Sequence, residues 1–516
     1  MLISDMIEWN ARRYPAKTAV VYEDRRISFA ELNKRGNSLA NGLRDLGVKK
    51  GDRVAVLADT CYQYVEILLA NPKAGIITVP LNYRFVPQEL AYVLTNCEAQ
   101  TIILGDDFKS TFESTRPYLK GATNIITIGE PSPGMISYDE LISSSPTDKP
   151  SVEVNEDDIV YIIYTGGTTA FPKGVMRTHK SMIAGAVANI IGHKLRHDDV
   201  CLLPVPPFHI ALIYLLVTYI YSGCTTVLHK WNPQDFLRLV ETERVTFVGL
   251  VPTMIRALVN LPELRKYDFS SLCRIPYSSA PMPEALLKLA MSIFGNKFDQ
   301  VYAMTEFCPI SLLPAETLEL ELARGKKDIL LSCGKEYINI ESRVVDEDGN
   351  DVAPGKIGEL IVRGDGIMSG YWNSPEETAK SLKGGYLHTG DIARVDEDGY
   401  IYIVDRAKDM IITGGENIFC PEVENVLSHH PAVLEVAVIG IPDDKWGEAV
   451  KALIILRPEI TATEQEIIEF CRPRMADYKR PKSVDFYKEF PRTPMGKVSK
   501  KDLKEKYWIG HARRIH

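Results

Sequence analysis

The 516-residue sequence predicts an α/β protein with a large N-terminal body, a β-rich subdomain and a small α+β C-terminal domain. Three observations predict this fold class. Strand-like runs alternate with helical patterns up to about residue 330, turn-rich alternating segments follow, and a short strand–strand–helix–strand pattern closes the chain. Alternating strands and helices are typical of parallel sheets covered by helices. Because the chain exceeds what one hydrophobic core organises, more than one domain is expected.

The body opens with a helical pattern at 27–46, where leucines recur near helical spacing, and continues with a short strand at 51–58. Further strands are predicted in "QTIILG", "NIITIG", "CTTVLH", "VTFVGLVP" and "SLCRIPYSS", with a helix at 283–294 among them. The most apolar run, 210–221, is too short for a bilayer, which takes about 20 residues. We therefore expect a buried helix there and no transmembrane segment.

The second half of the chain has the turn-rich, alternating pattern that is typical of β-hairpins. Residues 341–372 contain the turn-rich stretches "EDGN" and "APGK", and 391–406 form another hairpin pattern. The pattern then predicts two strands, a helix and a strand, in the segments "VLEVAVIG", "KALIILR", "EQEIIEFCRPRM" and "SVDFY", respectively. We expect an N-terminal domain at 1–407 and a C-terminal domain at 408–516.

Charge and cysteine usage exclude some classes of function. The net charge of -8 and pI near 5.8 do not suit a general nucleic-acid binder, which needs a basic surface. The nine cysteines are scattered without a C-x-x-C pair, and no secretory leader is recognised. We expect reduced thiols, a cytoplasmic location, and a monomer or homodimer.

A glycine-rich loop, "YTGGTTAFPKGV" at 164–175, directly follows the apolar run "DIVYIIY". Backbone N–H groups in such a loop converge on an anion, threonine hydroxyls add donors, and Lys173 adds a mobile positive charge, which together suit a polyphosphate. The spacing differs from G-x-x-x-x-G-K-[ST], so this is not an ordinary NTPase loop. A flexible surface loop is the alternative.

Nine further motifs occur in order along the chain: "PFHI" (207–210), "SSAPMP" (278–283), "YAMTE" (302–306), "GELIVRG" (358–364), "GYLHTGD" (385–391), "DRAKDMIITGGENI" (405–418), "IPDDKWGE" (441–448), "YKRPK" (478–482) and "PMGKVSK" (494–500). With them the loop resembles the adenylate-forming superfamily of acyl- and aryl-CoA synthetases, luciferases and peptide-synthetase adenylation domains, whose loop reads roughly YTSGTTGxPKGV. The resemblance is closest to the acyl- and aryl-CoA ligases. It implies that an acid and ATP give an acyl-adenylate and pyrophosphate, and that CoA then gives an acyl-CoA and AMP.

The resemblance implies roles for individual residues. The ATP-binding set is Thr165, Gly166, Gly167, Thr168, Thr169, Lys173, Ala280, Tyr302, Thr305, Asp391 and Arg406. Within it, the loop threonines and Lys173 hold the β- and γ-phosphates, while Tyr302 offers a flat face to adenine and Asp391 accepts the ribose hydroxyls. Glu306 would hold Mg²⁺, a hard cation that prefers oxygen ligands. The alternatives are a solvated carboxylate at Glu306 and a surface ion pair between Asp391 and Arg406.

By the same resemblance, Lys497 is the catalytic lysine, and Lys408 is the pivot about which the C-terminal domain turns between the two half-reactions. One ammonium aimed at both carboxylate and α-phosphate lowers the barrier to their reaction. The CoA-binding set is Gly414, Gly415, Trp446, Tyr478, Arg480, Lys482 and Arg84. Its glycines would line a pantetheine tunnel, although two glycines also suit a simple hairpin turn.

The acid pocket is expected around His209, Ala303 and Met304. Amino-acid-activating relatives carry an aspartate where this chain has His209, so an α-amino acid is disfavoured; a core histidine is the alternative. Ala303 replaces a usual glycine and favours a medium-sized, branched or aromatic acid. Gly166 and Ala170 also depart from the usual loop. A carrier-protein-loading adenylation enzyme and a degenerate nucleotide-binding protein remain as competing hypotheses.

Overall fold

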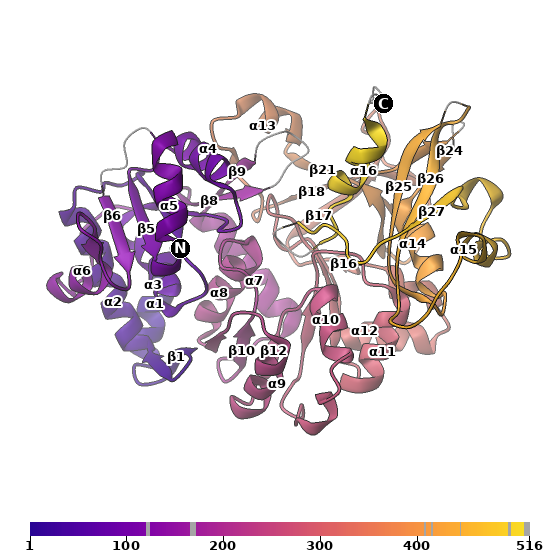
Figure 1. The fold of residues 1–516 in the computed structure, drawn as a ribbon. Helices are drawn as coiled ribbons and strands as arrows, with labels where there is room; N and C mark the ends of the chain where they lie inside the picture. Colours follow the sequence, from indigo (N-terminus) through magenta and orange to yellow (C-terminus); the bar gives the residue numbers. More distant parts are fainter. Residues whose placement is uncertain are drawn as a thin grey trace.

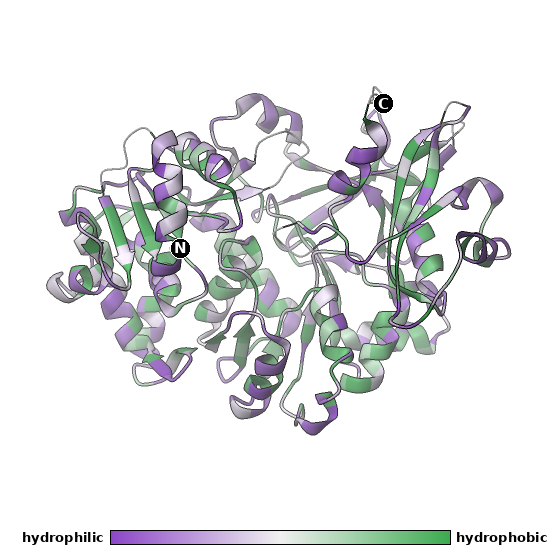
Figure 2. Ribbon diagram, in the orientation of Figure 1, coloured by the Kyte–Doolittle hydropathy of each residue, from purple (hydrophilic) through white to green (hydrophobic). Residues whose placement is uncertain are grey.

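A computed structural model of the chain describes residues 1–119, 124–165, 172–406, 409–413, 416–443, 445–493 and 497–509. It confirms the α/β class. Figure 1 shows the sheets of the body beside a C-terminal sheet that is coloured orange to yellow. Figure 2 shows that apolar residues concentrate along the strands, as expected for sheets covered on their faces.

The largest sheet has eight strands in the order β19-β9-β8-β4-β3-β5-β6-β7. Its strands are β3 (Arg53–Leu57), β4 (Ile77–Pro80), β5 (Thr101–Gly105), β6 (Asn124–Ile128), β7 (Ile136–Ser137), β8 (Ile159–Thr165), β9 (Lys173–Thr178) and β19 (Gly370–Tyr371). The run from β8 to β7 is parallel, as predicted, but β9 pairs antiparallel with β8, and β19 pairs antiparallel with β9. For β9 the reason is that only a short loop separates it from β8, and a parallel crossover needs a dozen or more residues.

Two more sheets complete the body, one in the order β12-β10-β11-β1-β2 and one in the order β13-β14-β15-β16. Their strands are β1 (Thr18–Tyr22), β2 (Arg25–Ser28), β10 (Val200–Leu203), β11 (Thr225–Leu228), β12 (Phe247–Val248), β13 (Ile275–Tyr277), β14 (Phe298–Tyr302), β15 (Ser311–Leu313) and β16 (Lys335–Glu336). All the strands predicted for the body from the sequence occur, although β12 is much shorter than its apolar run.

The helices of the body are α1 (Ile3–Arg13), α2 (Phe29–Asp45), α3 (Tyr62–Ala70), α4 (Pro87–Cys97), α5 (Lys109–Thr115), α6 (Tyr138–Ser144), α7 (His179–His193), α8 (Ile210–Ser222), α9 (Pro233–Thr242), α10 (Pro252–Val259), α11 (Glu284–Phe294) and α12 (Ala315–Ala323). Short 3₁₀ helices are η1 (Asn71–Ala74), η2 (Asp106–Phe108), η3 (Arg116–Tyr118), η4 (Leu264–Lys266), η5 (Lys327–Leu331) and, near the C-terminus, η6 (Asp477–Lys479). The apolar run after 210 forms α8, which is buried as predicted. In the described ranges we find no helix of the length and apolarity that a membrane span requires.

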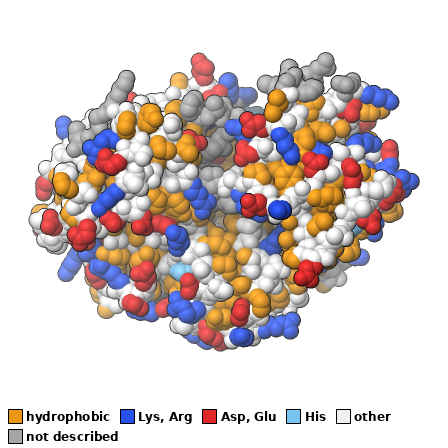
Figure 3. Space-filling view, in the orientation of Figure 1, with side chains coloured by type: hydrophobic (Ala, Val, Ile, Leu, Met, Phe, Trp, Pro, Cys, Tyr) orange, Lys and Arg blue, Asp and Glu red, His pale blue; other side chains and the backbone are white. Residues whose placement is uncertain are grey.

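The β-rich subdomain contains β17 (Ile340–Val345), β18 (Ile357–Gly364), β20 (Leu382–Lys383), β21 (Tyr386–Val395) and β22 (Ile401–Arg406), with α13 (Pro375–Ser381) beside it. The last sheet contains β23 (Ile411–Thr413), β24 (Glu416–Ile418), β25 (Val433–Asp443), β26 (Gly447–Leu456) and β27 (Ser483–Phe486). Helices α14 (Cys420–Ser428), α15 (Glu464–Cys471) and α16 (Lys500–Trp508) accompany it. It has a hydrophobic core of its own around Ile411, Val438 and Ile454. On the face in Figure 3, basic and acidic side chains are interspersed.

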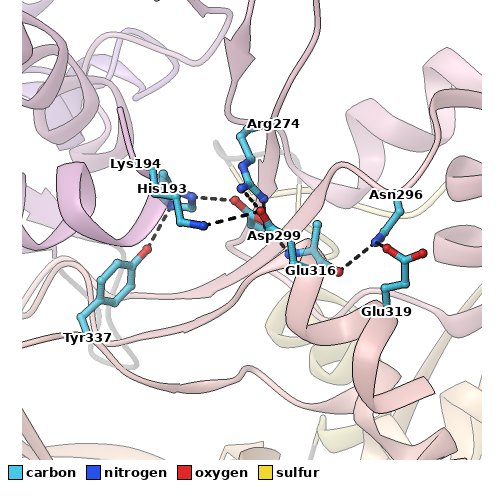
Figure 4. Close-up of polar contacts among 9 residues, drawn as sticks. His193, Lys194, Arg274, Asn296, Asp299, Glu316, Glu319 and Tyr337 are labelled. Atoms are coloured by element: carbon cyan, nitrogen blue, oxygen red, sulfur yellow. Dashed lines mark hydrogen bonds and ion pairs between the residues drawn. The ribbon is translucent and has the colours of Figure 1, made fainter. Parts of the chain in front are cut away.

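A buried polar cluster holds the beginnings of β13 and β14 (Figure 4). Asp299 on β14 is 1% exposed, and its Oδ2 lies 2.7 Å from His193 Nδ1 at the end of α7. Its Oδ1 accepts from the Ala315 backbone N–H at 2.8 Å and lies 3.3 Å from Arg274 Nη1, just before β13. Tyr337 Oη lies 3.0 Å from His193 Nε2. Because a carboxylate only accepts, His193 donates to Asp299 through Nδ1. The cluster therefore ties α7 and α12 to two strands whose far ends carry "SSAPMP" and "YAMTE".

Candidate active site

A cavity of about 2690 Å³ lies between the body and the C-terminal sheet. Its lining includes eight of the residues selected from the sequence: Ala280, Tyr302, Ala303, Met304, Asp391, Arg406, Trp446 and Lys497. They come from the ends of β13 and β14, from β21 and β22, and from two loops of the C-terminal part. The cavity thus gathers residues that lie more than 200 positions apart in the sequence.

Tyr302 and Asp391 form a hydrogen-bonded pair at the body side of the cavity. Tyr302 Oη donates to Asp391 Oδ2 at 2.5 Å. Burial, and then the neighbouring carboxylate of Asp391, raise the pKa of Tyr302 well above its usual range, so the phenol remains a donor. Arg406 faces Asp391 across β21 and β22, with Nε 3.3 Å from Oδ1. Asp391 is buried and Arg406 is exposed, so this pair is not an ordinary surface ion pair.

The "YAMTE" segment ends in a tight turn that a buried arginine holds. The backbone N–H of Met304 donates to the Phe307 carbonyl at 3.0 Å, and the reverse bond is 3.2 Å. Arg177 Nη1 donates to the Thr305 carbonyl at 2.9 Å, and Arg177 is fully buried on β9. Burial lowers the pKa of Arg177 to about 10, so its charge persists near neutrality. The sequence analysis missed Arg177, although a lone charge within a buried strand pattern could have indicated it.

Glu306 is held from both its backbone and its side chain by one neighbouring segment. The Met368 N–H donates to the Glu306 carbonyl at 2.8 Å, and Tyr371 Oη donates to Glu306 Oε1 at 2.8 Å. Within the described ranges, no three His, Cys, Asp or Glu side chains are grouped as a metal cage would require. A single oriented carboxylate fits Mg²⁺, which binds proteins through one or two carboxylates and takes its other ligands from phosphates and water.

Thr165 and Lys173 stand opposite each other where β8 ends and β9 begins. Gly166, Gly167, Thr168, Thr169 and Ala170 lie outside the described residues. The ammonium of Lys173, predicted to be a mobile charge, contacts Glu377 Oε2 on α13 in this structure and lies 5.2 Å from the centroid of the Tyr371 ring. Strand pairing sets the backbone of Lys173, and the contact with Glu377 orients its ammonium group.

His209 is the capping residue at the N-terminus of α8, and the charge of Lys497 acts on it. His209 Nδ1 accepts from the Ala211 N–H at 3.1 Å, so the hydrogen of its neutral ring is on Nε2. Burial, and in addition the ammonium of Lys497, lower the pKa of His209 to about 3. A lysine of the last segment and a histidine 288 positions earlier (497 minus 209) therefore share one electrostatic environment.

The residues selected for CoA do not gather in the cavity. Trp446 lines it and is 49% exposed, at the tip of the β25–β26 hairpin. Tyr478 and Arg480 lie at η6, and Arg480 contacts Asp477. Lys482 is anchored to β26 through its backbone N–H, and Arg84 is exposed beside Tyr83. Lys408, Gly414 and Gly415 lie outside the described residues.

We expect the pKa of His209 to make the protein less stable in acid. Its folded value of about 3 lies below the ordinary 6.5, so its contribution is complete above pH 6.5 and is lost as pH falls towards 3. Between pH 6.5 and 5 the loss is at most about 2 kcal/mol, at about 1.4 kcal/mol per pH unit. Urea unfolding at pH 7 and pH 5 should show a smaller difference for His209→Asn, which keeps a capping oxygen. An equal difference in both proteins would contradict this.

Comparison with known proteins is consistent with this geometry. A family model described as "AMP-binding enzyme" matches residues 7–372, and one described as "AMP-binding enzyme C-terminal domain" matches residues 422–497. The feruloyl-CoA synthase of an Amycolatopsis species is 37% identical over 499 residues, covering 96% of this chain and 97% of its own.

Two further relatives differ in the thiol or the acid that their names give. The fatty acid–[acyl-carrier-protein] ligase ScoC of Streptomyces coeruleorubidus is 32% identical over 515 residues, covering 98% of this chain and 97% of its own. The crystal structure of the anthranilate CoA ligase AuaEII in complex with anthranoyl-AMP superimposes with a TM-score of 0.91 at 30% identity, covering 99% and 98%. Each of these similarities spans nearly the whole chain.

Proposed function

This chain belongs to the AMP-binding enzyme family, and from that premise we propose how its residues perform the reaction of an ATP-dependent carboxylic acid–CoA ligase. It is an AMP-forming acyl- or aryl-CoA ligase that uses ATP. The observation that carries our assignment of roles is the position of Lys497, which lines the cavity together with Tyr302, Asp391 and Arg406. Its ammonium is also close enough to His209 to lower the pKa of that imidazole.

In the first half-reaction, a carboxylate oxygen of the acid attacks the α-phosphorus of ATP and pyrophosphate leaves. Lys497 is proposed to place its ammonium between the two anions, which lowers the barrier electrostatically. Asp391 accepts the ribose hydroxyls, and the Tyr302 ring packs on adenine. Arg177 holds the turn that presents Thr305 to the α-phosphate. Glu306 holds Mg²⁺, which when bound neutralises charge on the phosphates.

In the second half-reaction, the thiol of CoA attacks the acyl carbonyl carbon, the thiol proton is lost and AMP leaves. We propose that the C-terminal domain, 408–516, turns about Lys408 to admit the thiol past Gly414 and Gly415. Trp446, Tyr478, Arg480, Lys482 and Arg84 are proposed to bind the nucleotide end of CoA. The dispersal of these residues fits the arrangement of the C-terminal domain that serves adenylation, in which Lys497 lines the cavity in place of the path for the thiol.

The acid is proposed to be medium-sized and acyl or aromatic. Ala303, the second residue of "YAMTE", lines the cavity and packs against the hydrophobic cluster that contains Ala188 and Tyr337. His209, with no charge at neutral pH, offers an N–H rather than a carboxylate to the acid. The names feruloyl-CoA synthase and anthranilate CoA ligase support an aromatic acid.

The test is a panel of carboxylic acids incubated with ATP, Mg²⁺ and CoA, with acyl-CoA and AMP measured by mass spectrometry. We expect one size class of acids to give both products in equal amounts. A second candidate, transfer to a carrier-protein thiol, is favoured by the similarity to ScoC. It predicts pyrophosphate release with little acyl-CoA from free CoA. The same preparation can be examined for a monomer or homodimer, and we propose a cytoplasmic location because ATP and CoA are supplied there.

A further inference from the structure

The segment from β19 into α13 contacts the two groups proposed to meet the phosphates and the metal. Tyr371 on β19 donates to Glu306 Oε1, and its ring lies 5.2 Å from the ammonium of Lys173. Glu377 on α13 contacts that same ammonium through Oε2. One short segment, absent from the motifs recognised in the sequence, therefore reaches both Lys173 and Glu306.

The contact between Lys173 and Glu377 is partly shielded from water. The Lys173 side chain is 21% exposed and that of Glu377 is 33% exposed. Lys380, one turn along α13, donates to the other oxygen, Oε1, at 2.8 Å. Lys173, followed by Lys380, lowers the pKa of Glu377 to about 2, so the carboxylate is charged at any pH at which the enzyme would work. Glu377 is thus a permanent counter-ion that binds one lysine with each oxygen.

Lys173 has little freedom beyond this contact. It is the first residue of β9 and is paired in register with Thr165, so its backbone is set by the sheet. The Tyr371 ring supports the side chain, and a cation over an aromatic face is attracted to it. Rotation of the long side chain is the remaining freedom, and Glu377 removes it. An ammonium held in advance loses less entropy when it binds a phosphate.

We propose that Glu377 is a positioning residue for ATP: it holds the Lys173 ammonium at the start of β9, ready for the β- and γ-phosphates. The inference rests on the phosphate-binding role proposed for Lys173. Glu377 itself touches no substrate. The effect of Glu377 is therefore confined to the steps in which ATP or pyrophosphate is bound.

The experiment compares Glu377→Gln with wild type and with Glu376→Gln, a neighbouring exposed carboxylate on the same helix. We expect Glu377→Gln to raise the KM for ATP in adenylation, and the KM for pyrophosphate in the reverse reaction, by about five- to tenfold, the scale of one net hydrogen bond. The kcat should stay within about twofold. Conversion of supplied acyl-adenylate with CoA should be unchanged, because no polyphosphate takes part. Glu376→Gln should match wild type throughout.

A double variant shows whether Glu377 acts through Lys173. Lys173→Gln combined with Glu377→Gln should have the same KM for ATP as Lys173→Gln alone. An unchanged KM in Glu377→Gln, an additive double variant, or an equal loss in the thiol step would overturn the proposal. So would a lowered KM, because the carboxylate would then compete with ATP for the lysine. Failure of wild type to adenylate any acid would instead overturn the proposed function, so the two failures are distinguishable.

Discussion

Lys497→Ala is expected to slow acyl-adenylate formation by about 10²- to 10³-fold, the scale for removing one preorganised electrostatic donor. Lys497 lines the cavity that also contains Tyr302 and Asp391, and its ammonium lowers the pKa of His209. No other change that we propose at the site removes a charge from between the two reacting anions. Single-turnover release of pyrophosphate from labelled ATP would measure the effect.

The thiol step provides the contrast for this prediction. Because Lys497 is assigned to adenylation alone, the variant should convert supplied acyl-adenylate and CoA to acyl-CoA at close to the wild-type rate. Lys488→Ala, which removes an exposed lysine of the same C-terminal part, should leave both rates unchanged. Equal loss of both half-reactions in a folded Lys497→Ala protein would mean that one fixed arrangement serves both chemistries, and the turning of the C-terminal domain would have to be abandoned.

The strands of the body could be predicted because each is a short apolar run bounded by turn residues. That pattern is local, so it identified β5, β6 and β11 correctly. The antiparallel position of β9 could not be predicted in the same way, since its residues alternate no differently from those of a parallel neighbour. Only the shortness of the connection from β8 to β9 decides it. The polar helix α13 was also missed, because it has no buried residue to give it an apolar stripe.

The residues of the candidate site also fall into those that could be predicted from the sequence and those that could not. Tyr302, Asp391, Arg406 and Lys497 stand in motifs, and the structure brings them to one cavity. Glu377 and Tyr371 act through contacts with residues 204 and 65 positions away, and a single sequence carries no record of which distant side chains meet. The contact between Lys173 and Glu377 could not be predicted for the same reason, since Glu377 lies on a segment that the sequence analysis left unassigned.

The second large effect concerns the scaffold beneath these residues. Asp299 accepts hydrogen bonds from the Ala315 N–H and from His193, lies 3.3 Å from Arg274, and is 1% exposed. Removing one partner of a buried ionic cluster costs about 3–5 kcal/mol, because the groups left behind stay buried without their hydrogen bonds. Asp299→Ala is therefore expected to lower the free energy of unfolding of the body by about that amount.

Glu316→Ala is the matched control for Asp299→Ala, because Glu316 also binds Arg274, at 2.7 Å, but is 57% exposed. Water replaces an exposed carboxylate, so this variant should lose no more than about 1 kcal/mol. Urea unfolding followed by tryptophan fluorescence would measure both. Since Asp299 lies near the start of the strand that ends at Tyr302, we also expect Asp299→Ala to weaken ATP binding below its unfolding midpoint, which Glu316→Ala should not do. Equal stability of the two variants would show that the cluster is replaceable by water, and that β14 is held by its apolar neighbours alone.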